Sequence, residues 1–242
     1  SIAVSDVDKD GDPDLVLGNL GENFYLHPQN DAPVKLWIKD FDNNHTVDKV
    51  FSKTWQEKDV PVFTKRELTD ALPGLKKMNL KHEEYARKTI QEILGAATKE
   101  ATILEVRTAQ SAIAYNNGKG VFILKALPMP AQLSSVHAIW TGDVNNDAYP
   151  DLVLSGNFFD LLPQFCRLDA ASGWVLINDR KGGFTALEKK QCGLNLQGQT
   201  RDILSVKSQG GAYLIFLENN STPALYRFNN NRFASAQSFT RP

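Results

Sequence analysis

The sequence predicts an all-β fold with a helical insertion, and three features support this fold class. An acidic segment flanked by short strand-forming runs occurs three times, further apolar runs alternate with turn signals, and one stretch carries helix signals. The 242 residues are enough for one large domain or two small ones. The apolar runs are too short to span a bilayer, and 27 basic against 28 acidic side chains do not indicate a nucleic-acid partner.

The acidic segment is an internal repeat. Residues 6–19 read DVDKDGDPDLVLGN, residues 143–157 read DVNNDAYPDLVLSGN, and residues 40–48 form a looser copy, DFDNNHTVD. Each copy lies between two runs of β-forming residues, which predicts a strand, an acidic turn and a second strand. These runs are 2–4 with 15–17, 34–38 with 47–51, and 136–140 with 152–154.

Most of the remaining chain also predicts antiparallel strands. Turn signals such as Asn116-Asn117-Gly118 and Lys181-Gly182-Gly183 separate short β-type runs and favour hairpin connections. The expected strands are 103–106, 112–115, 121–124, 174–177, 203–206, 213–217 and 225–228.

One stretch, residues 64–95, departs from this pattern. Thr64 followed by Glu67 is a capping box, and a later run places Ile90, Ile93 and Leu94 on one helix face before Gly95. We therefore expect a β segment over 1–63 with the first two acidic loops, a helical insertion over 64–95, and a second β segment over 96–242 with the third loop.

The acidic loops are candidate calcium sites. Carboxylates crowded into nine residues repel one another unless a cation compensates them, and Ca²⁺ takes six to eight oxygen ligands. Positions 1, 3, 5 and 9 would supply side-chain oxygens and position 7 a backbone carbonyl. The predicted ligands are Asp6, Asp8, Asp10, Asp12 and Asp14 in the first loop, Asp40, Asp42, Asn44, Thr46 and Asp48 in the second, and Asp143, Asn145, Asp147, Tyr149 and Asp151 in the third.

Position 6 distinguishes the loops, because the sharp turn there favours glycine. The first loop has Gly11, whereas the others have His45 and Ala148, which predicts more strained turns and weaker sites. An EF-hand is excluded, since its bidentate Glu at position 12 is replaced by Leu17, Phe51 and Leu154. The alternative for each loop is an acidic, solvated hairpin that binds no metal.

The pattern D-x-D-x-D-G-x-x-D followed by DLVLGN resembles the FG-GAP or VCBS repeat of integrin α subunits and bacterial surface proteins. The resemblance implies a calcium-stabilised β-propeller. The chain is shorter than seven four-stranded blades require, so about four blades of a partial ring are expected.

A broader resemblance covers nearly the whole chain. The segments PVKLWIKDFD, RELTDALPGLKK, GNFFDLLPQ and GLNLQGQTRDI resemble, in order, the C-terminal part of FG-GAP proteins of Bacteroidetes related to the ASPIC/UnbV group. This resemblance implies export to the cell surface, either extracellular or on the outer membrane, often through a lipoprotein anchor upstream of this chain. It implies no established enzymatic chemistry.

No catalytic constellation is visible in the sequence. The four histidines show no metal-binding spacing, no nucleophile elbow or phosphate loop occurs, and Cys166 and Cys192 match no redox or metal motif. The leading hypothesis is a noncatalytic surface protein that contacts a protein or glycan, including an accessory subunit of an outer-membrane complex. The alternative is a propeller-based polysaccharide lyase or hydrolase, or its carbohydrate-binding module.

Overall fold

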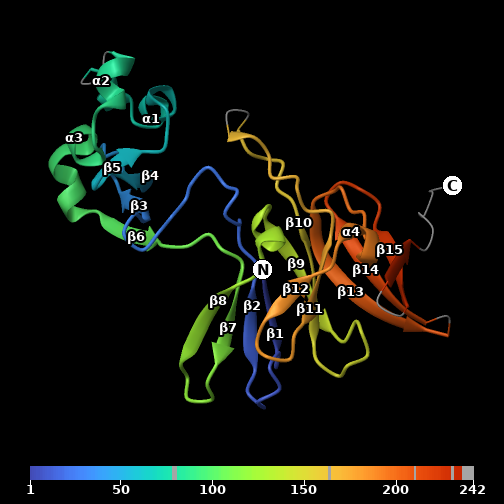
Figure 1. Cartoon of the computed structure of the whole chain (residues 1–242). Helices are drawn as coiled ribbons and strands as arrows, with labels where there is room; N and C mark the ends of the chain where they lie inside the picture. Colours follow the sequence, from blue (N-terminus) through green and yellow to red (C-terminus); the bar gives the residue numbers. More distant parts are fainter. Residues whose placement is uncertain (78–80, 163–164, 210, 230–231, 236–242) are drawn as a thin grey trace. The chain divides into compact units, whose positions relative to one another are not determined.

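The chain forms two compact units, seen in a computed structural model that describes residues 1–77, 81–162, 165–209, 211–229 and 232–235 (Figure 1). Unit 1 comprises residues 1–25 and 110–242, and unit 2 comprises residues 26–109. Unit 2 is therefore inserted in sequence between two parts of unit 1.

Unit 1 contains three four-stranded antiparallel sheets. Sheet A has the order β1-β2-β7-β8, with β1 at Ile2–Ser5, β2 at Asp14–Leu17, β7 at Ala112–Asn116 and β8 at Phe122–Ala126. Sheet B has the order β12-β11-β10-β9, with β9 at Val136–Gly142, β10 at Asp151–Gly156, β11 at Trp174–Asn178 and β12 at Phe184–Ala186. Sheet C has the order β13-β14-β15-β16, with β13 at Thr200–Ser208, β14 at Gly211–Glu218, β15 at Ala224–Asn229 and β16 at Arg232–Ser235.

The three sheets of unit 1 lie side by side, and strand β9 contacts both β1 and β13 (Figure 1). Sheet B is buried on both faces. Alternate residues of β10 point to opposite sides, so Leu152 and Leu154 join one core with Val16 and Ile113 of sheet A. The intervening Val153 joins a second core that includes Ile203, Leu214 and Phe216 of sheet C. The third acidic copy thus supplies a strand, β10, whose two faces contribute to two different cores.

Short helical segments connect the strands of unit 1. The 3-10 helix η3 spans Met129–Gln132, and α4 spans Lys189–Cys192 and ends at Gly193 in the left-handed conformation, with φ of 76°. Both cysteines are free: Cys166 is exposed and Cys192 is buried in the core between sheets B and C.

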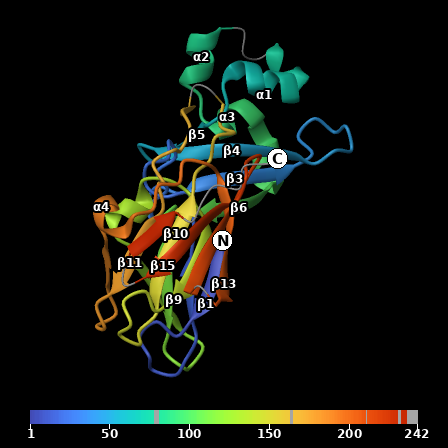
Figure 2. The same cartoon turned by 90° about the vertical axis from the view of Figure 1, so that its right-hand side faces the viewer.

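Unit 2 is a four-stranded sheet, sheet D, with helices packed against it (Figure 2). Its order is β5-β4-β3-β6, with β3 at Val34–Lys39, β4 at Asp48–Trp55, β5 at Lys58–Pro61 and β6 at Thr102–Val106. Trp37 and Val50 of this sheet pack with Leu68, Tyr85 and Ile93 of the helical segment. The helices are α1 at Lys65–Ala71, η1 at Pro73–Lys76, α2 at His82–Ala86, α3 at Ile90–Leu94 and η2 at Gly95–Glu100.

Two helix ends of unit 2 lie where the sequence predicts them. The Thr64–Glu67 capping box begins α1, and Gly95, with φ of 63°, ends α3. The run expected around Ala86 to Leu94 is divided into α2 and α3, because a second capping box, Thr89 with Glu92, starts a new helix.

The mostly β architecture is confirmed, with four antiparallel sheets and short helices. Every expected strand is present, while β5, β12 and β16 were not expected. The structure also draws the unit boundaries differently from the expected 1–63, 64–95 and 96–242. Sheet D shares its core with the helices, so these form one compact unit over residues 26–109. Among the described residues, none of the helices has the length and apolar character needed to cross a membrane.

Candidate metal centre

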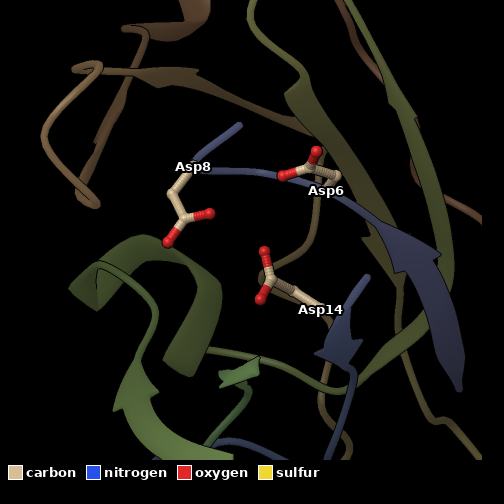
Figure 3. A group of neighbouring side chains, drawn as sticks. All are labelled: Asp6, Asp8 and Asp14. Atoms are coloured by element: carbon tan, nitrogen blue, oxygen red, sulfur yellow. The ribbon is translucent and has the colours of Figure 1, made fainter. Parts of the chain in front are cut away.

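Three carboxylates of the first acidic loop converge on one point (Figure 3). Asp6 follows β1, Asp14 begins β2, and the antiparallel pairing of Ser5 with Asp14 brings these strand ends together. Asp6, Asp8 and Asp14 each place a carboxylate oxygen within 4.8 Å of the other two. This arrangement has the oxygen chemistry of a hard-cation site.

Asp14 is fixed in this position by the backbone. It is fully buried, its Oδ2 accepts a hydrogen bond from the Val7 N–H at 3.0 Å, and its Oδ1 accepts one from the Asn116 N–H at 2.8 Å. Asn116 ends β7, so Asp14 connects the acidic loop to the neighbouring strand. The side chain of Asn116 also donates to the Pro13 carbonyl at 3.2 Å.

The turn of the first loop has the backbone geometry that its sequence predicts. Gly11 adopts a φ of 99°, and its N–H donates to Asp6 Oδ2 at 3.2 Å. At the same position of the other loops, His45 and Ala148 have φ values of 67° and 69°. Because side chains other than glycine are disfavoured there, the second and third turns carry the expected backbone strain.

The electrostatics of the first loop favour a bound cation. Burial raises the pKa of Asp8 above its ordinary value, and the negative charges of Asp14, Asp10 and Asp6 raise it further against one hydrogen bond from the Asp10 backbone. In addition, Asp6 Oδ1 is buried without a hydrogen-bond partner within the described part of the chain. A buried oxygen without a partner is costly, so these residues fit a positive ligand at this point.

Asp10 and Asp12 do not belong to the convergent group. Asp10 is exposed, and its Oδ1 accepts the Asp12 N–H at 2.9 Å, which keeps the turn closed. Asp12 was predicted to offer its carbonyl oxygen, as were Thr46 and Tyr149 in the other loops.

The second loop, which connects β3 and β4 in unit 2, also gathers three carboxylates. Asp40, Asp42 and Asp48 each place a carboxylate oxygen within 4.8 Å of the other two. Figure 2 shows the loop projecting beyond the ends of β3 and β4. Asp48 Oδ2 accepts the Phe41 N–H at 2.8 Å, as Asp14 does from Val7. The Asn44 side chain accepts the Thr46 N–H at 2.7 Å.

The carboxylates of the second loop are more solvated than those of the first. Partial burial opposes ionisation of Asp40, but hydrogen bonds from the backbone of His45, Asn44 and Asn43 outweigh it and lower the pKa of this carboxyl. Its charge is thus stabilised within the loop itself, which reduces the need for a cation.

The third loop, between β9 and β10, repeats the backbone pattern with a different charge arrangement. Asp151 is buried and accepts the Val144 and Asn178 N–H groups, both at 2.8 Å. Burial raises the pKa of Asp151 despite these two bonds, with the charges of Asp147 and Asp143 adding to the effect. Within the described residues, the third loop has no group of three carboxylates like those of the other two loops, because position 3 is Asn145 where they have Asp8 and Asp42.

An arginine forms an ion pair with one carboxylate of the third loop. Arg180, from the turn after β11, places its Nε 2.9 Å from Asp147 Oδ2, and the Asp147 side chain is only 8% exposed. Hydrogen bonds from the Tyr149 backbone, from Asn145 and from Arg180 lower the pKa of Asp147 against its burial. The third loop therefore holds an internal cation at one of its predicted ligands.

Three residues that contact the loops were not predicted from the sequence: Asn116, Asn178 and Arg180. The two asparagines end β7 and β11. The backbone N–H of each donates a hydrogen bond to the aspartate at position 9 of a loop, and the side-chain Nδ2 of each donates to the carbonyl of the proline before that aspartate. Asn178 Nδ2 also donates to the Val7 carbonyl at 2.7 Å, which links sheet B to the first loop of sheet A. An asparagine that ends a strand just before a glycine-containing turn, present in both segments, is the signal that identifies this position.

Comparison with known families agrees with the loop geometry. Residues 1–34 match the family model of the FG-GAP repeat, and these residues contain β1, the first acidic loop and β2. This match supports a protein of the FG-GAP repeat type. Neither a curated protein nor a solved structure matches the chain.

Proposed function

We propose that the chain is a calcium-stabilised β-propeller protein of the FG-GAP type that mediates interactions outside the cell. The observation that carries the proposal is the convergence of the Asp6, Asp8 and Asp14 carboxylates, one of which, Asp6, has a buried oxygen without a hydrogen-bond partner among the described residues. This site lies inside the segment that matches the FG-GAP repeat. FG-GAP repeats often bind calcium.

The packing of unit 1 supports the propeller part of the proposal. Four-stranded antiparallel sheets stack face to face, and an edge strand of sheet B contacts an edge strand of each neighbour, as the inner strands of propeller blades do. In this proposal calcium stabilises the first hairpin of sheet A, which carries the convergent carboxylates, while other loops are free to contact a partner.

The proposed location is the extracellular or outer-membrane surface, with a lipoprotein anchor and a protein or glycan partner. FG-GAP repeats are typical of extracellular or surface proteins, and the broader likeness to ASPIC/UnbV-related proteins agrees with that location. Sites with three carboxylates on exposed hairpins also suit the weaker calcium affinities of extracellular modules, with Kd values of about 0.1–1 mM.

Differential scanning calorimetry of the chelator-treated protein, with and without millimolar calcium, tests this function. A ligand that binds only the folded state stabilises it by RT ln(1 + [L]/Kd), which is about 0.4–1.4 kcal/mol per site for about 1 mM calcium and a Kd of about 0.1–1 mM. We expect calcium to raise the melting temperature and magnesium to raise it less. An unchanged melting temperature would overturn the structural role of calcium.

A further inference from the structure

Unit 2 contains a groove of about 570 Å³, within the usual range of ligand pockets, that no acidic loop touches. Strands β4 and β5 and helices α1 and α2 line it. The residues that matter for the argument are Lys53, Trp55, Pro61, Lys65, His82 and Tyr85.

Trp55 lines this groove and does not belong to the hydrophobic core of unit 2. It ends β4, next to a tight turn in which Gln56 and Glu57 have φ values of 48° and 63°. Its side chain is 62% exposed, whereas Trp37 is buried and its Nε1 donates to Ser52 Oγ at 2.8 Å. A large exposed indole on a rigid hairpin presents a flat apolar face at low conformational cost.

The groove is lined by basic residues. Lys53, Lys65 and His82 line it, and no carboxylate does. Lys53 forms no ion pair within the described ranges, in contrast to Lys35 of the same sheet, which lies 2.9 Å from Asp59. The groove therefore presents positive charge beside an aromatic face, although the chain as a whole has a net charge of −1.

These features define the ligand chemistry. A small anion would not use the apolar face of the Trp55 indole, and a neutral sugar would not use the positive charge of the lysines. The neighbouring edge strand β5 has only four residues and ends at Pro61, which lacks an N–H group, so it is a poor template for an added peptide strand.

We infer that the groove binds an acidic saccharide. One sugar ring stacks on Trp55, and its carboxylate pairs with Lys53 and Lys65. This inference rests on the proposed function, because it assigns a glycan class and a binding position to the interaction role.

Titration calorimetry with digalacturonate, and with the neutral digalactose as its counterpart, tests the inference on the full chain in calcium-free and calcium-containing buffer. We expect the acidic sugar to bind more tightly, with an affinity that falls as salt rises. Trp55→Ala should weaken binding about tenfold, Trp55→Phe should retain most of it, and Lys53→Gln with Lys65→Gln should remove the preference for the acidic sugar.

Lys77→Gln, an exposed lysine outside the groove, is the matched control and should leave binding unchanged. Circular dichroism verifies that each variant is folded. Equal affinities for the acidic and neutral sugars, an unaltered affinity in a folded Trp55→Ala variant, or tighter binding of a hexaglutamate peptide would each overturn the inference. Such failures leave the calcium-dependent melting temperature untouched, so they are distinct from a failure of the proposed function.

Discussion

Asp14 has two roles in the first loop, as a predicted metal ligand and as a brace for the backbone. Both of its oxygens accept main-chain N–H groups, from Val7 and Asn116, and the side chain is fully buried. Asp151 repeats this arrangement with Val144 and Asn178. The brace operates without metal, because it requires only the carboxylate and two amides.

The brace can be separated from the metal-binding role by substitution in calcium-free buffer. Asp14→Ala leaves a buried N–H group of Val7 and a partly buried one of Asn116 without their partner, so we expect a loss of about 2–5 kcal/mol in the free energy of unfolding. Asp10→Ala, which removes only the exposed hydrogen bond from the Asp12 N–H, should cost about 1 kcal/mol or less. Urea denaturation measures both, and a metal-free Asp14→Ala protein as stable as wild type would disprove the brace.

Arg180 is the residue that sets the third loop apart from the other two. Its guanidinium competes with any metal for Asp147 Oδ2. We expect Arg180→Ala to tighten cation binding at the third loop by up to about fivefold, since a partly exposed ion pair contributes up to about 1 kcal/mol.

Terbium luminescence sensitised by Tyr149, which lies at position 7 of this loop, provides the measurement for Arg180→Ala. Lys181→Ala, the exposed neighbour, is the control and should give the wild-type signal. A weaker terbium signal in the Arg180→Ala variant would show that the arginine supports the metal instead of replacing it.

At the level of elements, hairpins that carry acidic loops could be predicted because their signals are local. The repeat DLVL lies directly after the acidic run in the first and third copies, and the Thr64–Glu67 capping box begins α1 where expected. Strands β5, β12 and β16 were missed because they have three or four residues and weak apolar alternation. The ion pair of Arg180 with Asp147 also escaped prediction, since it joins two separate hairpins. That the third loop has no third carboxylate at positions 1, 3 and 9 is, in contrast, visible in the sequence as Asn145.

The first and second loops differ in burial, so their contributions to calcium-dependent stability should differ. We expect Asp6→Asn with Asp8→Asn to remove more of the calcium-induced rise in melting temperature than Asp40→Asn with Asp42→Asn, which changes the same two positions. The first loop has Gly11, a buried Asp14 and a buried oxygen without a described partner, whereas the second is exposed and has its turn at His45. Calorimetry of both variants decides this, and the reverse order would contradict it.

At the scale of the whole molecule, pairing between distant segments could not be predicted. Strand β2 pairs with β7, although all of unit 2 lies between them in the sequence. Local periodicity carries no information about such partners. The repeat did predict that similar sheets would recur, and sheets A and B follow it residue by residue, from Leu15 and Leu152 onward.

The outer face of sheet A is apolar and exposed. Ile2 and Val4 lie opposite Leu17 and Leu15, and they are 70% and 63% exposed. Leu124 of β8 shares this face. Because Leu152 and Leu154, the repeat counterparts of Leu15 and Leu17, pack against another sheet, the proposed propeller requires a further sheet to cover this face.

A protein with this face uncovered should associate at high concentration. We expect the triple variant Ile2→Thr, Val4→Thr and Leu124→Thr to shift the sedimentation velocity distribution toward the monomer, because threonine keeps strand propensity but removes apolar surface. Lys189→Gln, at an exposed polar position, is the control and should not shift it. If the wild type is already fully monomeric at such concentrations, the face does not need a cover.

The central claim is that Asp6, Asp8 and Asp14 enclose a calcium ion, and an anomalous difference map tests it most directly. Crystals grown in millimolar calcium and measured at a long X-ray wavelength would reveal the ion by its anomalous scattering. We expect a peak with oxygen distances of about 2.3–2.6 Å to these three carboxylates. A map with no anomalous peak there, or with only ordered water at hydrogen-bonding distances, would contradict it.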